Sequence, residues 1–203
     1  AANGHPLPGN YFGMVYKGGF IVPVLMGMLL MVIIFSFERF FVINKATGKG
    51  NVDAFVKNVQ KFLSVGHVDS AVAECDKQEG SVANVIKAGL MRYKEMEQDA
   101  KMNTEQKCLA IQKDIEEATA LEMPMLEQNL TVIATLVSVG TLMGLLGTVT
   151  GMIKAFSALS SAGSPDQATL ANGISEALIN TATGISTSAL AIIMYNVFTS
   201  KID

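Results

Sequence analysis

One acidic residue, Glu176, lies inside a long stretch of apolar and small residues in the last part of the sequence. No other charged residue occurs between Asp166 and Lys201. A carboxyl group within a membrane-spanning helix is costly, and it usually faces a polar interior or a water-filled cavity. It can avoid part of that cost by taking up a proton, and a proton path needs a group of this kind. Glu176 is therefore the first candidate site residue.

Polar residues recur at steps of three and four along the helix predicted around Glu176. At 100° per residue they fall within one narrow stripe, while Ile, Leu and Ala occupy the other faces. One polar stripe on an apolar helix indicates a pore lining, although packing is the commoner role for any single hydroxyl residue in a membrane. The members of the stripe are Thr169, Asn172, Glu176, Asn180, Thr183 and Thr187.

A second segment carries pairs of glycines four residues apart. Small residues at this spacing let helix backbones approach closely, so the pattern predicts helix packing. It is not a phosphate loop, because Gly-Lys-Ser/Thr is missing. Thr148 lies about nine residues before the predicted loop tip and Glu176 about ten after it, so a hairpin would place the hydroxyl beside the carboxyl. The glycines are Gly140, Gly144, Gly147 and Gly151.

Three uncharged runs of about 20 residues predict three membrane-spanning helices, because a hydrocarbon core of about 30 Å requires that length. The fold class is therefore an all-α integral membrane protein. The predicted spans are residues 18–37, 128–156 and 167–200, with a helical domain at 38–127 between the first and second.

Basic residues set the predicted orientation. Only Lys17 precedes the first span, whereas Arg39, Lys45, Lys49 and Lys57 follow it. The positive-inside rule then places the N-terminus outside and the helical domain in the cytoplasm. Residues 1–17 and 157–166 are accordingly expected on the periplasmic side and residues 201–203 on the cytoplasmic side.

Composition excludes several function classes. The net charge of −3 is unlike the basic face of a nucleic-acid-binding protein. The two cysteines do not form a disulfide framework, and the two histidines are far apart, so neither a metal site nor a cofactor is predicted. No nucleophile–base pair is recognisable, and the chain is not expected to be an enzyme.

Two stretches resemble the MotA/TolQ/ExbB proton channel family, and most closely its ExbB members. Gly144–Ile153, followed by Ala155 and Phe156, resembles the second-span signature of ExbB and TolQ, and Gly173–Gly184 resembles the third-span signature. One span precedes the polar domain here, as in ExbB and TolQ, whereas MotA has two. The proline that the family usually has three residues before Gly144 is replaced by Thr141.

The resemblance implies a motor subunit of the bacterial inner membrane, driven by protons. It implies a homo-oligomer, a pentamer in ExbB, which encloses the single transmembrane helices of a dimeric partner resembling ExbD or TolR. That partner carries a titrating aspartate. The matching polar pore positions are Thr148, Glu176 and Thr181, although on an ideal helix Thr181 points about 140° away from Glu176.

Three functions stay open on the sequence. An ExbB-like subunit would couple the proton gradient to a TonB-like transducer and to outer-membrane transport. A TolQ-like subunit would serve envelope maintenance. A membrane scaffold that conducts nothing is the third alternative.

Overall fold

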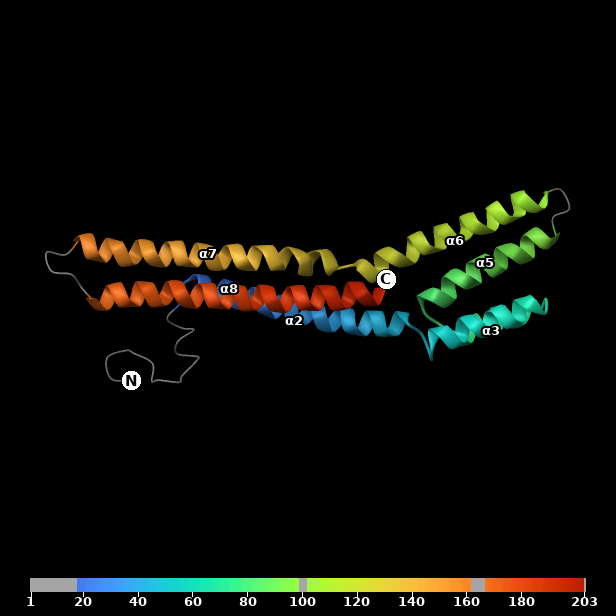
Figure 1. Cartoon of the computed structure of the whole chain (residues 1–203), viewed down its shortest axis with the longest axis horizontal. Helices are drawn as coiled ribbons and strands as arrows, with labels where there is room; N and C mark the ends of the chain where they lie inside the picture. Colours follow the sequence, from blue (N-terminus) through green and yellow to red (C-terminus); the bar gives the residue numbers. More distant parts are fainter. Residues whose placement is uncertain (1–17, 99–101, 162–166, 203) are drawn as a thin grey trace. The chain divides into compact units, whose positions relative to one another are not determined.

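The computed structural model describes residues 18–98, 102–161 and 167–202, and the regular structure within these ranges is helical (Figure 1). Contacts divide the chain into two units. The apolar unit takes the residues up to Phe37 and Asn129–Ser200, and the polar unit takes Glu38–Gln128 and the residues from Lys201 onward. The helices are α2 (Ile21–Ala46), α3 (Val52–Ser64), α4 (Val68–Gln78), α5 (Ser81–Gln98), α6 (Thr104–Glu127), α7 (Leu130–Ser161) and α8 (Gln167–Ile202).

Three stretches of the described residues are helical, long and apolar enough to cross a membrane by length and composition. They are Ile21–Ala46, Thr104–Ser160, of which α7 is the apolar part, and Gln167–Ile202. This confirms the predicted all-α class with three apolar helices, while the orientation in the membrane stays a prediction. With 32 and 36 residues, α7 and α8 are about 48 and 54 Å long, which exceeds a hydrocarbon core of about 30 Å.

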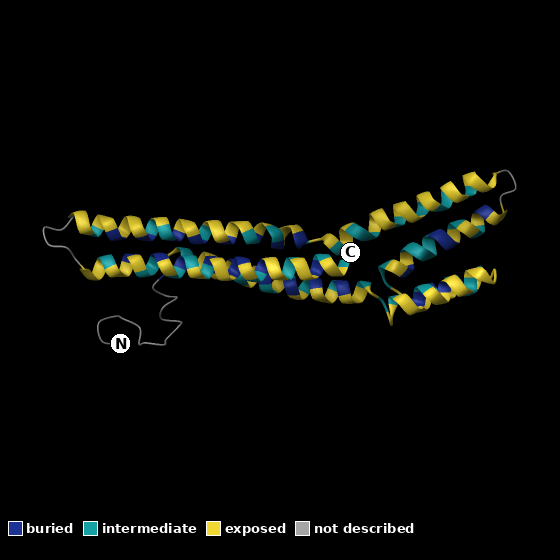
Figure 2. Ribbon diagram, viewed as in Figure 1, coloured by how far each residue is buried: buried dark blue, intermediate teal, exposed yellow. Residues whose placement is uncertain are grey.

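Small residues form the contact between α7 and α8, which run side by side in opposite directions (Figure 1). A Cβ atom built on Gly151 would lie 2.8 Å from the Cβ of Ala177, and one built on Gly184 would lie 2.7 Å from the carbonyl oxygen of Gly140. The glycines therefore leave no room for a methyl group. Exposed residues, coloured yellow in Figure 2, cover the side of α7 that faces away from α8. Among them, Leu142, Leu145 and Val149 are each at least half exposed.

The polar unit has its own small core. It consists of residues from α3, α4 and α5, whose apolar side chains recur at helical spacing in the sequence. α6 lies against α5, where Gly89 takes the Ile115 side chain into the space that a Cβ would fill. The core residues are Phe55, Val59, Ala71, Cys75, Ala83 and Leu90.

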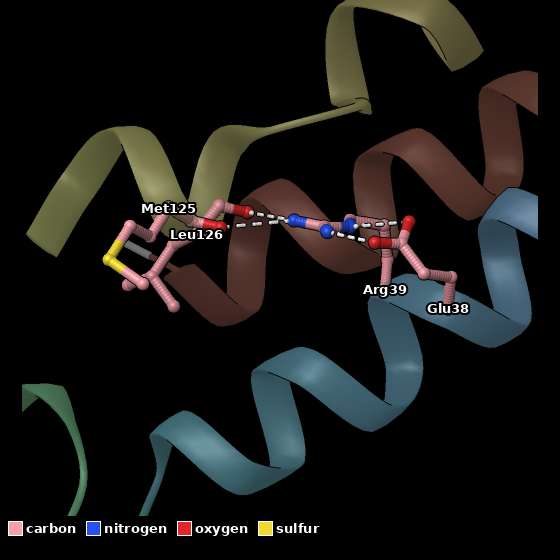
Figure 3. A network of polar contacts seen from close by, with 4 residues as sticks. All are labelled: Glu38, Arg39, Met125 and Leu126. Atoms are coloured by element: carbon pink, nitrogen blue, oxygen red, sulfur yellow. Dashed lines mark hydrogen bonds and ion pairs between the residues drawn. The ribbon is translucent and has the colours of Figure 1, made fainter.

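A buried arginine joins two ends of the polar unit (Figure 3). The side chain of Arg39 is 1% exposed, and its Nη1 donates hydrogen bonds to the carbonyl oxygens of Met125 at 3.1 Å and Leu126 at 3.3 Å. Its Nε donates to the Glu38 carboxylate at 3.1 Å. The last carbonyls of a helix have no partner within the helix, so Arg39 supplies the hydrogen bonds that the end of α6 lacks.

A break in the helical path precedes α7. The sequence suggests a kink at Pro124 if this residue lies inside a helix, and Pro124 does lie inside α6, which continues to Glu127. The kink itself stays a prediction. The helical path ends at Gln128, and Asn129 adopts a positive φ of 65° before α7 begins. A proline in the last turn removes only one backbone N–H, whereas a left-handed residue cannot continue the helix.

Candidate functional site

An ion pair joins α7 to α8 within the apolar unit. The Nζ of Lys154 lies 2.6 Å from Oε1 of Glu176 and donates a hydrogen bond to it. The Glu176 side chain is 15% exposed and the Lys154 side chain 58%. The sequence-based interpretation of Glu176 as an unpaired acid is therefore wrong. That interpretation treated Lys154 only as the residue that ends an uncharged run. It did not consider which residue of α8 the Lys154 side chain would face.

The turn before α2 also lies against the Glu176 carboxyl group. A Cβ built on Gly19 would lie 2.0 Å from Oε1 and 2.7 Å from Cδ of Glu176. Gly19 also has a φ of +73°, a conformation that side-chain-bearing residues rarely adopt. The carboxyl group thus lies between an ammonium group of α7 and a backbone turn that only glycine allows at this distance. All three apolar helices meet at this point.

This contact corrects the predicted depth of Glu176. The sequence-based boundaries place Gly19 at the membrane surface and Glu176 roughly 15 Å deeper, yet the two residues lie in contact. The depth of Glu176 was counted from the loop between α7 and α8, and that count is less accurate than the boundary at Gly19. The reason is that α7 and α8 are longer than a bilayer core is thick, so the loop need not lie at the membrane surface. Relative to α2, Glu176 lies at the N-terminal end of the apolar stretch, next to the turn at Gly19.

Thr148 does not lie beside Glu176. The glycine contacts set the helix register, because Gly147 faces Asn180 and Gly151 faces Ala177. Thr148 is therefore level with Asn180, about one helical turn from Glu176. Its hydroxyl group donates to the carbonyl oxygen of Leu145 at 2.6 Å, within its own helix. The expected pairing of this hydroxyl with the Glu176 carboxyl is wrong.

The remaining predicted residues of α8 do not form one exposed stripe. The Thr181 hydroxyl donates across the helix contact to the carbonyl oxygen of Gly144 at 3.3 Å, and the Thr183 hydroxyl donates to Ile179 of its own helix at 2.8 Å. Asn180 is fully buried against Gly147. Neither its Oδ1 nor its Nδ2 has a hydrogen-bond partner among the described residues. Whether these positions line a pore stays a prediction.

Thr148 instead lines a shallow groove on the face of α7 that turns away from α8. The groove has a volume of about 570 Å³, and apolar side chains form most of it. Lys154 follows directly after Ile153, one of its lining residues. The groove is lined by Thr148, Val149, Met152, Ile153 and Phe156.

Comparison with known proteins identifies the family of the chain. The model of the MotA/TolQ/ExbB proton channel family matches residues 77–203, which is more than half of the chain. The chain belongs to this family.

Relatives within the family carry both ExbB and TolQ names. The chain is 24% identical to the Tol-Pal system protein TolQ of Pseudomonas aeruginosa over 194 residues, which is 95% of this chain and 84% of TolQ. It is 36% identical to a putative biopolymer transport protein, ExbB-like 3, of Synechocystis over 88 residues, 42% of either chain. It is 38% identical to the ExbB of Pseudomonas putida over 71 residues, or 35% of this chain and 22% of that protein.

Because the chain belongs to a proton channel family, the chemistry of the charged pair Lys154 and Glu176 is of interest. Lys154 and Glu176 are the only charged residues that the structure describes in the apolar unit. Their pairing balances the charge of the described part of that unit and leaves two polar groups near the start of α2, within α7 and α8. Such a cluster can orient water and accept or donate hydrogen bonds where the apolar helices end.

Sequence reasoning missed two members of the cluster. Gly19 was noted only as part of a weak likeness to the family, and its left-handed turn gives no signal in one sequence. Lys154 could have been found, because it is the one basic residue between Glu127 and Lys201 and lies on the helix paired with Glu176. The register was off by about one turn, and that error drew attention to Thr148 instead.

Proposed function

We propose that this chain is the channel-forming subunit of a proton-driven motor in a bacterial inner membrane, and that it resembles ExbB in coupling the proton gradient to a TonB-like transducer. The observation that carries the proposal is the Lys154–Glu176 pair, where three apolar helices of a proton channel family member meet. A bilayer tolerates such charges where they serve a path or a partner.

The motor is proposed to contain several copies of this chain around a partner. A closed ring, a pentamer by analogy with ExbB, would enclose the single transmembrane helices of a dimer resembling ExbD or TolR. The exposed apolar side of α7, including the groove that begins at Thr148, is the surface proposed to face such helices. Native mass spectrometry in mild detergent should show one closed oligomer, and a strictly monomeric chain would contradict the ring.

A TolQ-like role in envelope maintenance is the second candidate. The alignment with TolQ of Pseudomonas aeruginosa covers 95% of this chain, whereas the alignment with ExbB of Pseudomonas putida covers 35%. Neither coverage nor identity separates the two roles, because an ExbB homolog also covers 96% of this chain at 24% identity and another TolQ reaches 39% identity over 82 residues. The proposal names no enzymatic reaction under either candidate.

Complementation separates these functions. The chain would be expressed, together with the partner encoded beside its gene, in a strain lacking both ExbB and TolQ. Restored growth on iron bound to a siderophore supports the ExbB-like role, and restored resistance to detergents supports the TolQ-like role. Restoration of neither, with the complex assembled in the membrane, supports a scaffold that conducts nothing and contradicts the motor proposal.

Glu176 provides the matching loss-of-function test. Glu176→Ala should abolish whichever activity the wild-type chain restores, at a normal protein level, because the charged cluster is removed. Full activity of Glu176→Ala would contradict a role for this cluster in the working motor.

A further inference from the structure

Two neighbours restrict the position of the Glu176 carboxyl group, and both lie close to the same oxygen atom. Oε1 lies 2.6 Å from the Lys154 ammonium group, and the turn at Gly19 approaches Oε1 so closely that a Cβ there would overlap it. The Glu176 side chain is largely shielded at 15% exposure, whereas the Lys154 side chain is 58% exposed. Lys154 is therefore the more accessible member of the pair, and the carboxyl group is the one held in place.

Among the residues that the structure describes up to Phe37 and in Asn129–Ser200, neither charge has a substitute charged partner. Removing Lys154 leaves the largely shielded Glu176 carboxyl group without its charged partner, which is costly for the part of the pair that is buried. Lys154 and Glu176 should therefore behave as one unit in mutational experiments.

We propose that Lys154 is the positioning residue of this site: it pairs with the Glu176 carboxyl group and holds it against the Gly19 turn, so that the pair fastens the start of α2 to α7 and α8. Glu176 is then a fixed anion and does not carry the transported proton. The statement about the transported proton rests on the motor function proposed above, whereas the pairing itself does not.

Carbodiimide labelling tests the pairing without any transport measurement. A hydrophobic carbodiimide adds across the O–H bond of a protonated carboxyl group to give an O-acylisourea, which rearranges to a stable N-acylurea. A carboxylate paired with an ammonium group lacks that proton. The full-length chain in membranes would be treated with dicyclohexylcarbodiimide at neutral pH, and labelling of Glu176 would be followed by mass spectrometry.

The wild-type chain and Lys154→Arg should label slowly, and Lys154→Met should label roughly tenfold faster, because an opposite charge within a few ångströms favours the ionised form. Lys154→Arg is the matched control, since it keeps the charge and changes its shape. Equal labelling of Glu176 in the wild type and in Lys154→Met would overturn the proposal. Because the reaction is read on protein in the membrane, a chain that conducts nothing still gives a valid answer.

Charge exchange tests whether the pair works as a unit in the assembled complex. Lys154→Glu and Glu176→Lys should each lose most coupled activity, and the double exchange should recover at least a third of it. A double exchange as inactive as the single changes, with assembly intact, would show that the pair is not a unit. If the wild-type complex shows no coupled activity at all, the proposed function fails, while the labelling result still decides the pairing.

Discussion

Gly19 limits where the Glu176 carboxyl group can lie, and this can be tested with one methyl group. In Gly19→Ala the new Cβ would overlap Oε1 of Glu176, since the ideal distance is 2.0 Å. The positive φ of +73° adds a backbone penalty of about 1–2 kcal/mol. We expect the melting temperature in detergent to fall, and coupled activity to be largely lost because the carboxyl group must move away from Lys154.

Gly66→Ala is the matched control for backbone strain. Gly66 has a φ of +79°, close to that of Gly19, but a Cβ there would meet nothing within 4 Å. It should therefore pay the same penalty of about 1–2 kcal/mol and keep its activity. If both substitutions reduce activity equally, strain explains the loss and the contact with Glu176 does not.

Individual residues show how far one sequence can be interpreted. Glu176 stands out because an acid within an apolar helix is costly wherever it lies. Its partners do not stand out, because the pairing of Lys154 and the contact with Gly19 depend on the register of α7 against α8. An error of four residues in a loop count moves a side chain by about 6 Å, which is enough to place Thr148 beside Glu176 when it lies about one helical turn away.

The contact between α7 and α8 is set by residues that have almost no side chain. In Gly151→Ala the added methyl group would lie 2.8 Å from the Cβ and from the backbone nitrogen of Ala177. A backbone atom cannot turn aside as a flexible side chain can, so we expect a loss of about 1–3 kcal/mol in unfolding free energy. Denaturant titration of the protein in mixed micelles would measure it.

Gly27→Ala serves as the control within α2, because a Cβ there would meet nothing within 4 Å. Alanine is the better helix former, so this change should leave stability unchanged or raise it by up to about 1 kcal/mol. A similar loss for both substitutions would mean that glycine is needed for reasons other than the contact with α8.

Arg39 should contribute strongly to the stability of the polar unit. Arg39→Gln removes the guanidinium group whose Nη1 bonds the carbonyl oxygens of Met125 and Leu126. Buried carbonyl groups left without partners cost about 1–3 kcal/mol, so the unfolding midpoint should fall. Hydrogen exchange should become faster in the last turn of α6, the part that Arg39 caps.

Lys49→Gln is the comparison for Arg39. Its ion pair with Glu79 is exposed, with side chains 71% and 58% accessible, and exposed pairs contribute about 0–1 kcal/mol. An equal effect of the two substitutions would contradict the structural role of the buried arginine.

For the helices of the polar unit, the sequence-based prediction agrees with the structure where apolar periodicity and capping residues mark the helices. The apolar spacing in α3 and the break at Gly66 agree with the structure, as does the start of α6, where Asn103 and Gln106 form a capping box. α8 begins at the predicted residue 167 and ends at Ile202, close to the predicted 200, whereas α7 continues to Ser161, beyond the predicted end at 156. A span predicted from hydropathy stops where the bilayer should, whereas a helix continues as long as its backbone hydrogen bonds do.

For the whole molecule, the predicted orientation places the polar unit in the cytoplasm, and its two cysteines allow a direct test. Cys108 is exposed on α6, whereas Cys75 is buried in the core of the polar unit. Burial, with a smaller contribution from neighbouring Asp76, raises the pKa of the Cys75 thiol. Because the thiolate is the reactive form, a maleimide applied near neutral pH to the native chain should react with Cys108 and largely spare Cys75.

A membrane-impermeant maleimide should therefore label Cys108 in inverted inner-membrane vesicles and leave it unlabelled in intact spheroplasts. The opposite result is expected for Ser160→Cys in a Cys108→Ser background, because residue 160 lies near the end of α7 that is predicted to face the periplasm. Labelling after unfolding in detergent counts the total thiol in each sample. Labelling of Cys108 from the outside would reverse the orientation and place the Lys154–Glu176 pair at the cytoplasmic end of the helices. A proton would then reach the pair last instead of first, although the contacts within the chain would stay the same.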